Sequence, residues 1–174
     1  MLILVVGPSG AGKDTLLAAA RKTLRHDARF HFTRRVITRP VSAGGEDHEA
    51  ITEQEFAARD FALQWQAHGW LYGIPAEVID IREVVVANVS RTVIAEAAQR
   101  FSVRVIEVTA PRAVLAARLA ERGREDDSDA AARLARSVTL PSHIPIETVT
   151  NDGSLQDGTA RFLAALSRAA STAP

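Results

Sequence analysis

Continuous apolar runs alternate along this chain with stretches whose apolar residues recur at the period of a helix. Residues 2–6 (LILVV) are apolar at every position, which is typical of a parallel strand covered on both faces. Residues 15–24 are rich in helix formers, and their apolar side chains fall on or near one face. A buried strand, a glycine-rich turn and a helix are therefore predicted at the start of the chain.

The second half of the chain repeats this alternation. Strands are predicted at residues 84–89, 103–108 and 147–150, and helices at about 92–100, 113–122, 128–134 and 155–170. Strands and helices in this order predict an α/β layer fold with a mainly parallel central sheet. A single domain over residues 1–174 is expected, with its core at about 1–30 and 82–174.

The pattern changes between about residues 32 and 80. Short possible strands surround the pair Gly44-Gly45, and Thr52 followed by Glu55 matches a capping box that would begin a helix. This stretch is interpreted as a segment inserted into the core. A charged stretch at about residues 120–137 follows a predicted helix and is interpreted as a lid.

Composition limits the partners that the chain is expected to bind. Lys plus Arg and Asp plus Glu both number 21, so no overall field attracts nucleic acid or an anionic membrane, and neither is expected as a partner. The chain has no cysteine, which excludes disulfides and thiolate zinc sites and is compatible with a cytoplasmic location. The apolar run at the start is too short and wrongly flanked for a signal peptide or a membrane span.

A phosphate-binding loop is the clearest candidate site. Residues 7–13 (GPSGAGK) match the first seven places of G-x-x-x-x-G-K-[ST], directly after the first strand and before the first helix. Backbone N–H groups of such a loop face a polyphosphate, and Lys13 would reach its terminal oxygens. ATP is therefore expected as the phosphoryl donor, bound by nine residues: Gly7, Pro8, Ser9, Gly10, Ala11, Gly12, Lys13, Asp14 and Thr15. A plain glycine-rich turn is disfavoured because spacing, strand and helix agree.

The eighth place of the pattern holds Asp14 instead of a hydroxyl residue. Two interpretations stay open. Asp14 could bind Mg²⁺ as a carboxylate, directly or through water, or it could favour the positive end of the following helix. Thr15 is a weaker candidate ligand for the ion.

The loop and several later segments resemble a known family. The segment GPSGAGKDTL, followed by Ile37-Thr38-Arg39-Pro40 and by residues 69–73 (GWLYG), resembles guanylate kinases over nearly the whole chain. Within that superfamily, the combination of GKD, ITR, AGGEDH, WxAHGxxYG and NDGSL is similar to the ribose 1,5-bisphosphate phosphokinase family. The resemblance implies a P-loop NTPase fold, an acceptor-binding insertion at about 32–80 and ATP with Mg²⁺ as donor. It implies a phosphorylated sugar as acceptor, with 5-phosphoribosyl 1-diphosphate (PRPP) as product in phosphonate metabolism.

Departures from guanylate kinase favour an acceptor without a base. Ser42, His48 and Gln64 stand where that family has an arginine, a tyrosine and a guanine-reading glutamate, and Asn88 and Ser90 lie where it has acidic residues. A site without those carboxylates loses the contacts that discriminate guanine. The candidate acceptor-binding residues are Arg35, Arg39, His48, Gln64, Tyr72, Asn88 and Ser90.

Arginines carry most of the remaining predicted chemistry. Arg34 and Arg35 are either phosphate ligands or a solvated basic edge, whereas Arg39 matches the acceptor-phosphate arginine of the family. The resemblance implies that Arg122 and Arg133 act in catalysis with Lys13, and that Arg124, Asn151 and Asp152 contact ATP. The alternative for the lid arginines is an exposed helix with charge pairs. Trp65 and Trp70 are interpreted as packing residues.

Two other functions stay open at this stage. One is a nucleoside monophosphate kinase with altered base specificity, and the other is an interaction module that has lost catalysis. The intact loop disfavours the module. The sequence predicts no oligomeric state.

Overall fold

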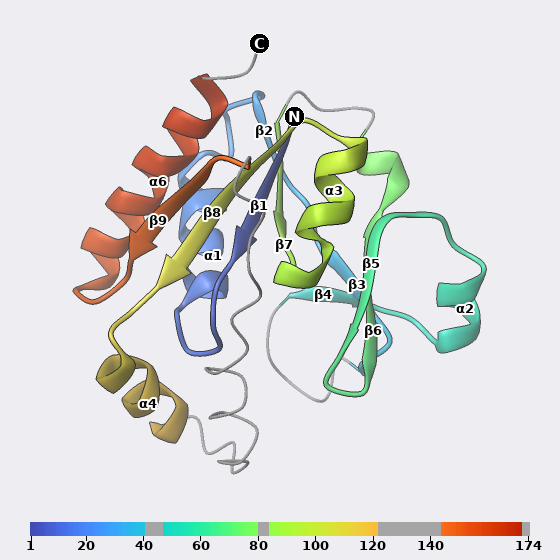
Figure 1. The fold of residues 1–174 in the computed structure, drawn as a ribbon, viewed down its shortest axis with the longest axis horizontal. Coiled ribbons are helices and arrows are strands. Elements are labelled where there is room, and N and C mark those ends of the chain that lie inside the picture. Colours follow the sequence, from blue (N-terminus) through green and yellow to red (C-terminus); the bar gives the residue numbers. More distant parts are fainter. Residues whose placement is uncertain (41–46, 80–83, 122–143, 172–174) are drawn as a thin grey trace.

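The computed structural model describes residues 1–40, 47–79, 84–121 and 144–171. Within them the central sheet has five parallel strands in the order β2-β7-β1-β8-β9 (Figure 1). Its strands are β1 (Leu2–Val6), β2 (Phe30–Phe32), β7 (Val84–Asn88), β8 (Val103–Thr109) and β9 (Ile146–Thr150). The predicted parallel sheet is confirmed, and β1 lies at its centre as the continuous apolar run indicated.

Both faces of the central sheet are covered. Ile3 and Val5 of β1 pack towards α1 (Lys13–Thr23) and α6 (Leu155–Ser171), which lie at the left of Figure 1. Leu2 and Leu4 point to the opposite face, where α3 (Ile94–Arg100) packs after the short 3-10 helix η3 (Arg91–Val93). Successive side chains of one strand therefore enter two separate cores, which explains why β1 has no polar position.

A second sheet of four strands lies beside the first, in the order β4-β3-β6-β5. Its strands are β3 (Arg35–Ile37), β4 (His48–Ala50), β5 (Phe61–Ala67) and β6 (Trp70–Pro75), followed by the 3-10 helix η2 (Ala76–Val78). Leu63 and Ile74 of this sheet share a core with β1 and α3. The inserted segment therefore packs against the body of the fold and faces the end of β1 where the glycine-rich loop begins.

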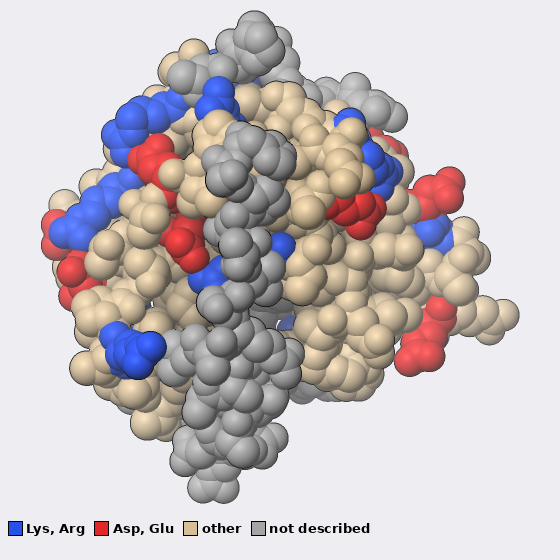
Figure 2. Space-filling view, viewed as in Figure 1, with Lys and Arg blue, Asp and Glu red and all other residues tan. Residues whose placement is uncertain are grey.

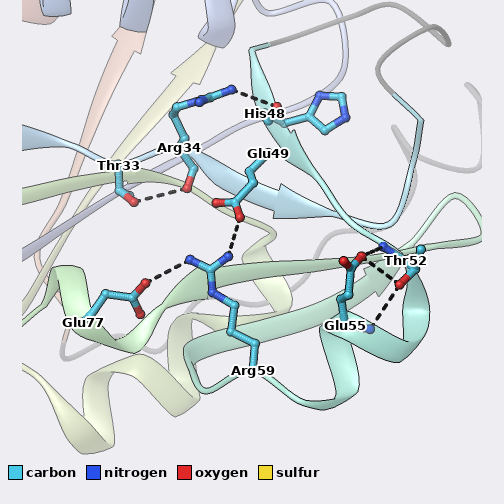
Figure 3. Close-up of polar contacts among 8 residues, drawn as sticks. All are labelled: Thr33, Arg34, His48, Glu49, Thr52, Glu55, Arg59 and Glu77. Atoms are coloured by element: carbon cyan, nitrogen blue, oxygen red, sulfur yellow. Dashed lines mark hydrogen bonds and ion pairs between the residues drawn. The ribbon is translucent and has the colours of Figure 1, made fainter.

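Polar contacts join the parts of the inserted segment (Figure 3). The predicted capping box is confirmed: Thr52 and Glu55 exchange hydrogen bonds at the start of α2 (Glu53–Ala57). Arg59 bridges Glu49 of β4 (2.6 Å) and Glu77 of η2 (2.9 Å). A cation shared by two carboxylates links the edge strand to the end of the segment more firmly than one exposed pair would.

Among the described residues, α4 (Arg112–Glu121) follows β8 and confirms the helix predicted at 113–122. The Gly44-Gly45 turn, the helix at 128–134 and most of the lid at 120–137 lie outside the described residues. Within the described ranges, no helix has the length and apolar character needed to cross a bilayer. Basic and acidic side chains are interspersed over the described surface of the face in Figure 2, in keeping with a formal net charge of zero.

Candidate active site

The loop between β1 and α1 has the backbone of a phosphate-binding loop. Gly7, Gly10 and Gly12 have φ angles of 143°, 83° and 85°, which disfavour a side chain. A Cβ on Gly7 would lie 1.9 Å from the carbonyl oxygen of Val108 in β8, so only glycine allows this close approach. Gly12 is the N-cap of α1, so the N–H groups of the first helical turn are directed towards the loop.

Lys13, the first residue of α1, curls back over the loop. Its ammonium donates to the carbonyl oxygens of Gly7 (2.8 Å) and Pro8 (3.0 Å). These contacts hold the charge at the wall of the cleft that the loop forms. A cation at this place can follow the terminal phosphate of a bound nucleotide.

Residues from distant parts of the chain brace the loop. The buried side chain of Asn151, just after β9, donates through Nδ2 to the carbonyl oxygen of Ala11 (2.8 Å). Arg118 of α4 donates to the carbonyl oxygen of Gly10 (3.4 Å). Contacts with other parts of the protein therefore hold the loop in its curved conformation, which does not depend on a ligand.

The loop forms one wall of a cleft of about 1010 Å³, and the inserted segment forms the other. Six cationic side chains line this cleft: Lys13, Arg21, Arg34, Arg35, Arg39 and Arg91. The described carboxylates among its lining residues are those of Asp14 and Asp47. Such an excess of positive charge in one concave site selects a strongly anionic ligand.

Asp14 lies where the two walls meet. Its Oδ1 accepts a hydrogen bond from Nδ2 of Asn88 at the end of β7 (2.7 Å) and lies 3.7 Å from a terminal nitrogen of Arg35. The carboxylate is half exposed, whereas the Arg35 side chain is only 15% exposed. Neither open interpretation of Asp14 included these two partners.

Arg35 belongs to a stack of side chains on the inserted segment. Its guanidinium lies over the ring of Tyr72 (5.7 Å to the centroid), and Tyr72 stacks on Trp65 (5.4 Å between centroids). Burial lowers the pKa of Arg35 to about 10, and Asp14 opposes this decrease. Arg35 thus stays charged at neutral pH, in a setting that favours an anionic partner.

Arg39 also faces the cleft, and its Nε is buried without a hydrogen-bond partner among the described residues. The Nε2–H of His48 donates to the carbonyl oxygen of Arg39 (3.0 Å). His48 is buried and does not line the cleft. The structure therefore places His48 as a support for the backbone of Arg39, not beside the predicted acceptor.

Other predicted residues are divided between the cleft and its surroundings. Tyr72, Asn88 and Ser90 line the cleft, and Ser90 also caps η3 by accepting from the N–H of Thr92. Gln64 is exposed and lines a second hollow, which shares Trp65 and Gln66 with the cleft, so Gln64 itself does not line the cleft.

Two of the other residues predicted to contact ATP lie outside the cleft. Asn151 is buried behind the loop, and the exposed Asp152 accepts from Arg161 (2.8 Å), whose hydrogen bond lowers the pKa of Asp152. Neither lines the cleft. The predicted residues Arg122, Arg124 and Arg133 lie outside the described part of the chain.

Three arginines near the site were not predicted. Arg21 of α1 and Arg91 of η3 line the cleft, and Arg118 contacts the loop. Arg21 and Arg34 both contact Asp47, at 3.4 and 2.8 Å. Their signal in the sequence was weak, because an arginine on a helix usually faces water.

The fold and the loop together define the class of the protein. A solved guanylate kinase from Anaplasma phagocytophilum superposes with a TM-score of 0.67 at 14% identity, covering 97% of this chain and 85% of that one. A gluconokinase from Sinorhizobium meliloti gives 0.54 at 18% identity, covering 97% and 93%. At such identities the likeness concerns the fold alone. With the loop of residues 7–13, it shows a P-loop NTPase fold like that of guanylate kinase, as predicted.

Sequence relatives narrow this class to a family. A "Ribose 1,5-bisphosphate phosphokinase PhnN" from Acidiphilium cryptum is 49% identical over 173 residues, covering 96% of this chain and 92% of the relative. A protein of the same name from Brucella abortus is 46% identical over 170 residues, covering 92% and 88%. A bifunctional ribose 1,5-bisphosphokinase-thymidine phosphorylase from Cupriavidus necator is 49% identical over 171 residues, but the match spans 28% of its length. No family model matches the chain.

The chain therefore belongs to the ribose 1,5-bisphosphate phosphokinase family, and it is a phosphotransferase. The family predicted from GKD, ITR and the later segments is confirmed.

Proposed function

We propose that this chain transfers the γ-phosphoryl group of ATP to ribose 1,5-bisphosphate, giving 5-phosphoribosyl 1-diphosphate and ADP. The cleft lined by six cationic side chains and two carboxylates carries the proposal, because ATP and a sugar bisphosphate together bring a large negative charge. The names of the full-length relatives supply the identity of the acceptor. A metabolite with phosphates at both ends fits such a cleft better than a neutral sugar does.

The walls of the cleft suggest how the two substrates are divided. The glycine-rich loop and Lys13 lie on the donor side, where backbone N–H groups face the polyphosphate. Arg35 and Arg39 lie on the acceptor side, and their forked guanidinium groups suit phosphate oxygens. An acceptor phosphate held there faces the terminal phosphate of the donor across the cleft.

In the proposed reaction, an oxygen of the acceptor's 1-phosphate forms a bond to the γ-phosphorus. The bond from that phosphorus to the bridging oxygen breaks, and ADP leaves with the electron pair. A phosphate monoester with a second pKa of about 6 is mostly dianionic at neutral pH, so no side chain needs to remove a proton. The chain's part is to align the two phosphates and to offset their charge.

Mg²⁺ is the expected companion of the nucleotide, and Asp14 fits a role in holding it. The half-exposed carboxylate lies in the cleft directly after Lys13 and offers the oxygen ligand that this ion prefers. Within the described residues there is no group of three or more His, Cys, Asp or Glu side chains that could form a complete metal cage. This fits an ion held mainly by phosphates and water with one carboxylate. When bound, the ion would neutralise charge on the β and γ oxygens.

The test offers the purified chain ATP and Mg²⁺ with one of four acceptors: ribose 1,5-bisphosphate, GMP, AMP or CMP. Phosphorus NMR identifies the products. We expect the signals of a sugar diphosphate with the bisphosphate and none of a nucleoside diphosphate beyond ADP. Rapid phosphorylation of a nucleotide with no reaction of the sugar would favour the altered nucleoside monophosphate kinase, and no transfer at all would favour an interaction module.

Arg118 is proposed as a donor-side residue because it donates to the loop at Gly10 and lies on α4, away from the acceptor wall. Replacing Arg118 with glutamine should raise KM for ATP about tenfold, the usual effect of losing one charged hydrogen bond. The KM for the acceptor should stay the same. Arg112→Gln, at the exposed start of the same helix, is the matched control. An equal rise of both KM values in Arg118→Gln would contradict a donor-side role.

A further inference from the structure

The Asp14 carboxylate is shared between the donor and acceptor walls of the cleft. It belongs to the first turn of α1, directly after the loop lysine, yet its charged partner Arg35 lies on β3 of the inserted segment. The two charges are 3.7 Å apart, which is beyond hydrogen-bonding distance, so the pair is close but loosely held. Asn88 donates to the same Oδ1 at 2.7 Å and fixes the direction of the carboxylate.

This position gives Asp14 an effect on the acceptor. Arg35 is mostly buried and stacks on Tyr72, so its charge is poorly solvated and attracts any anion within reach. A phosphate that approaches Arg35 meets the attraction of the guanidinium and the repulsion of the Asp14 carboxylate. The like charge of nearby Arg39 lowers the pKa of Arg35. Two guanidinium groups so close together favour an anion bound between them.

The same carboxylate has an effect on the donor. The nucleotide complex is anionic as a whole, but its divalent cation brings positive charge to the Asp14 carboxylate, which is proposed to help hold the ion. Once that charge is in place, the carboxylate is offset, and its repulsion of an acceptor phosphate at Arg35 decreases. The donor thus alters the acceptor site through one side chain.

We propose that Asp14 is a positioning residue that couples the two substrates: it acts as the internal counter-ion of Arg35 until the cation-bearing donor binds, and then releases Arg35 to the acceptor phosphate. The inference rests on the proposed function and adds an order of binding to it: the acceptor binds more tightly once the donor is bound. Linkage requires that the acceptor strengthen binding of the donor by the same factor. Unproductive binding of a sugar bisphosphate to the empty enzyme is thereby disfavoured.

Asp14→Asn tests the coupling with little change of shape. The amide keeps an oxygen that can accept from Asn88, so the variant removes the charge and retains the hydrogen bond. Asp14→Ser is the second variant, because a hydroxyl is the usual residue at this place and it can contact Mg²⁺ without a charge. Glu147→Gln is the control: it also removes one carboxylate, but Glu147 pairs with Arg168 on the far side of the fold.

Calorimetry measures Kd for ribose 1,5-bisphosphate alone, and again with saturating Mg²⁺ and an ATP analogue whose β–γ bridge is an imido group. In the unaltered chain the analogue should lower Kd about fivefold, at the low end of couplings between sites because Asp14 is half exposed. Asp14→Asn and Asp14→Ser should bind the acceptor about fivefold tighter without the analogue, and the analogue should then change Kd less than about twofold. The difference in Kd for the acceptor between the variants and the unaltered chain should decrease as the salt concentration is raised.

The outcomes separate the inference from the function on which it rests. If both Asp14 variants bind the acceptor as the unaltered chain does, with the same response to the analogue, the coupling role is overturned and the proposed function stands. Weaker acceptor binding in Asp14→Asn would also overturn it, because Asp14 would then assist the acceptor directly. If the unaltered chain binds no ribose 1,5-bisphosphate in either state, the proposed function fails, and the coupling role fails with it. Thermal melting confirms that each variant is folded.

Discussion

Replacing Lys13 with alanine should lower kcat about a thousandfold while leaving the protein folded. The ammonium lies at the cleft wall against the carbonyl oxygens of Gly7 and Pro8, where it can move with the transferred phosphoryl group. Preorganised charge of this kind is the main catalytic contribution in phosphoryl transfer, and losing one such group typically costs about two to three orders of magnitude or more. Lys13 packs no core, so the free energy of unfolding should change by less than about 0.5 kcal/mol.

The chain provides a matched control for this variant, because its other lysine lies on the same helix. Lys22 is exposed in the last turn of α1 and does not line the cleft. Lys22→Ala should have the turnover of the unaltered chain, measured as ADP release in the presence of both substrates. Turnover in Lys13→Ala within about tenfold of normal would contradict the assigned role of the loop.

Replacing Arg39 with glutamine should raise KM for ribose 1,5-bisphosphate about a hundredfold with little change in KM for ATP. The Nε of Arg39 is buried and has no hydrogen-bond partner among the described residues, so an acceptor phosphate would supply one. Removing one partner of a desolvated, hydrogen-bonded charge pair commonly costs about two or more orders of magnitude in affinity. Steady-state kinetics with each substrate varied in turn measure the two constants.

Two further variants show whether the geometry of Arg39 matters as well as its charge. Arg39→Lys should recover only part of the loss, because an ammonium cannot bind a phosphate in the forked manner of a guanidinium. Arg29→Gln, at an exposed arginine paired with Asp27 outside the cleft, should leave both constants unchanged. A rise of KM for ATP in Arg39→Gln, with an unchanged KM for the acceptor, would contradict this prediction, because Arg39 would then bind the donor.

Several elements of the fold were predictable because their signals are local. The five apolar residues of β1, the three glycines of the loop and the capping box at Thr52 each fix backbone conformation within a few residues. The parallel sheet followed from the alternation of strands and helices. Short-range patterns of this kind specify local conformation largely independently of the rest of the chain.

The cleft wall formed by the inserted segment was harder to predict, because side-chain direction in a strand changes with every residue. Gln64 and Trp65 are neighbours on β5, yet Trp65 reaches the cleft as well as the adjoining hollow, whereas Gln64 lines only the hollow. His48 matched a family position, but β4 turns it inward to the backbone of Arg39. A resemblance gives the position of a residue along the chain, and the register of the sheet decides what its side chain meets.

Contacts between distant segments left no pattern in the sequence. The bond from Asn88 to Asp14 joins residues 74 positions apart, and the one from Arg118 to Gly10 joins residues 108 apart. Asp14 was assigned to the metal or to the helix end because both alternatives are local. Its partner Arg35 could not be predicted, because the contact depends on the packing of β3 beside the loop.

The brace behind the loop also has a consequence for how the chain is made. Asn151 lies 140 positions after Ala11, whose carbonyl oxygen it fixes, and Gly158 of α6 packs so closely that a Cβ there would lie 2.4 Å from the Asn151 side chain. A growing chain has its first residues long before this brace exists. Because contacts of such sequence separation form late, the nucleotide site should mature only after β9 and α6 have left the ribosome. A nascent chain should therefore carry no active phosphate loop, however complete its first half is.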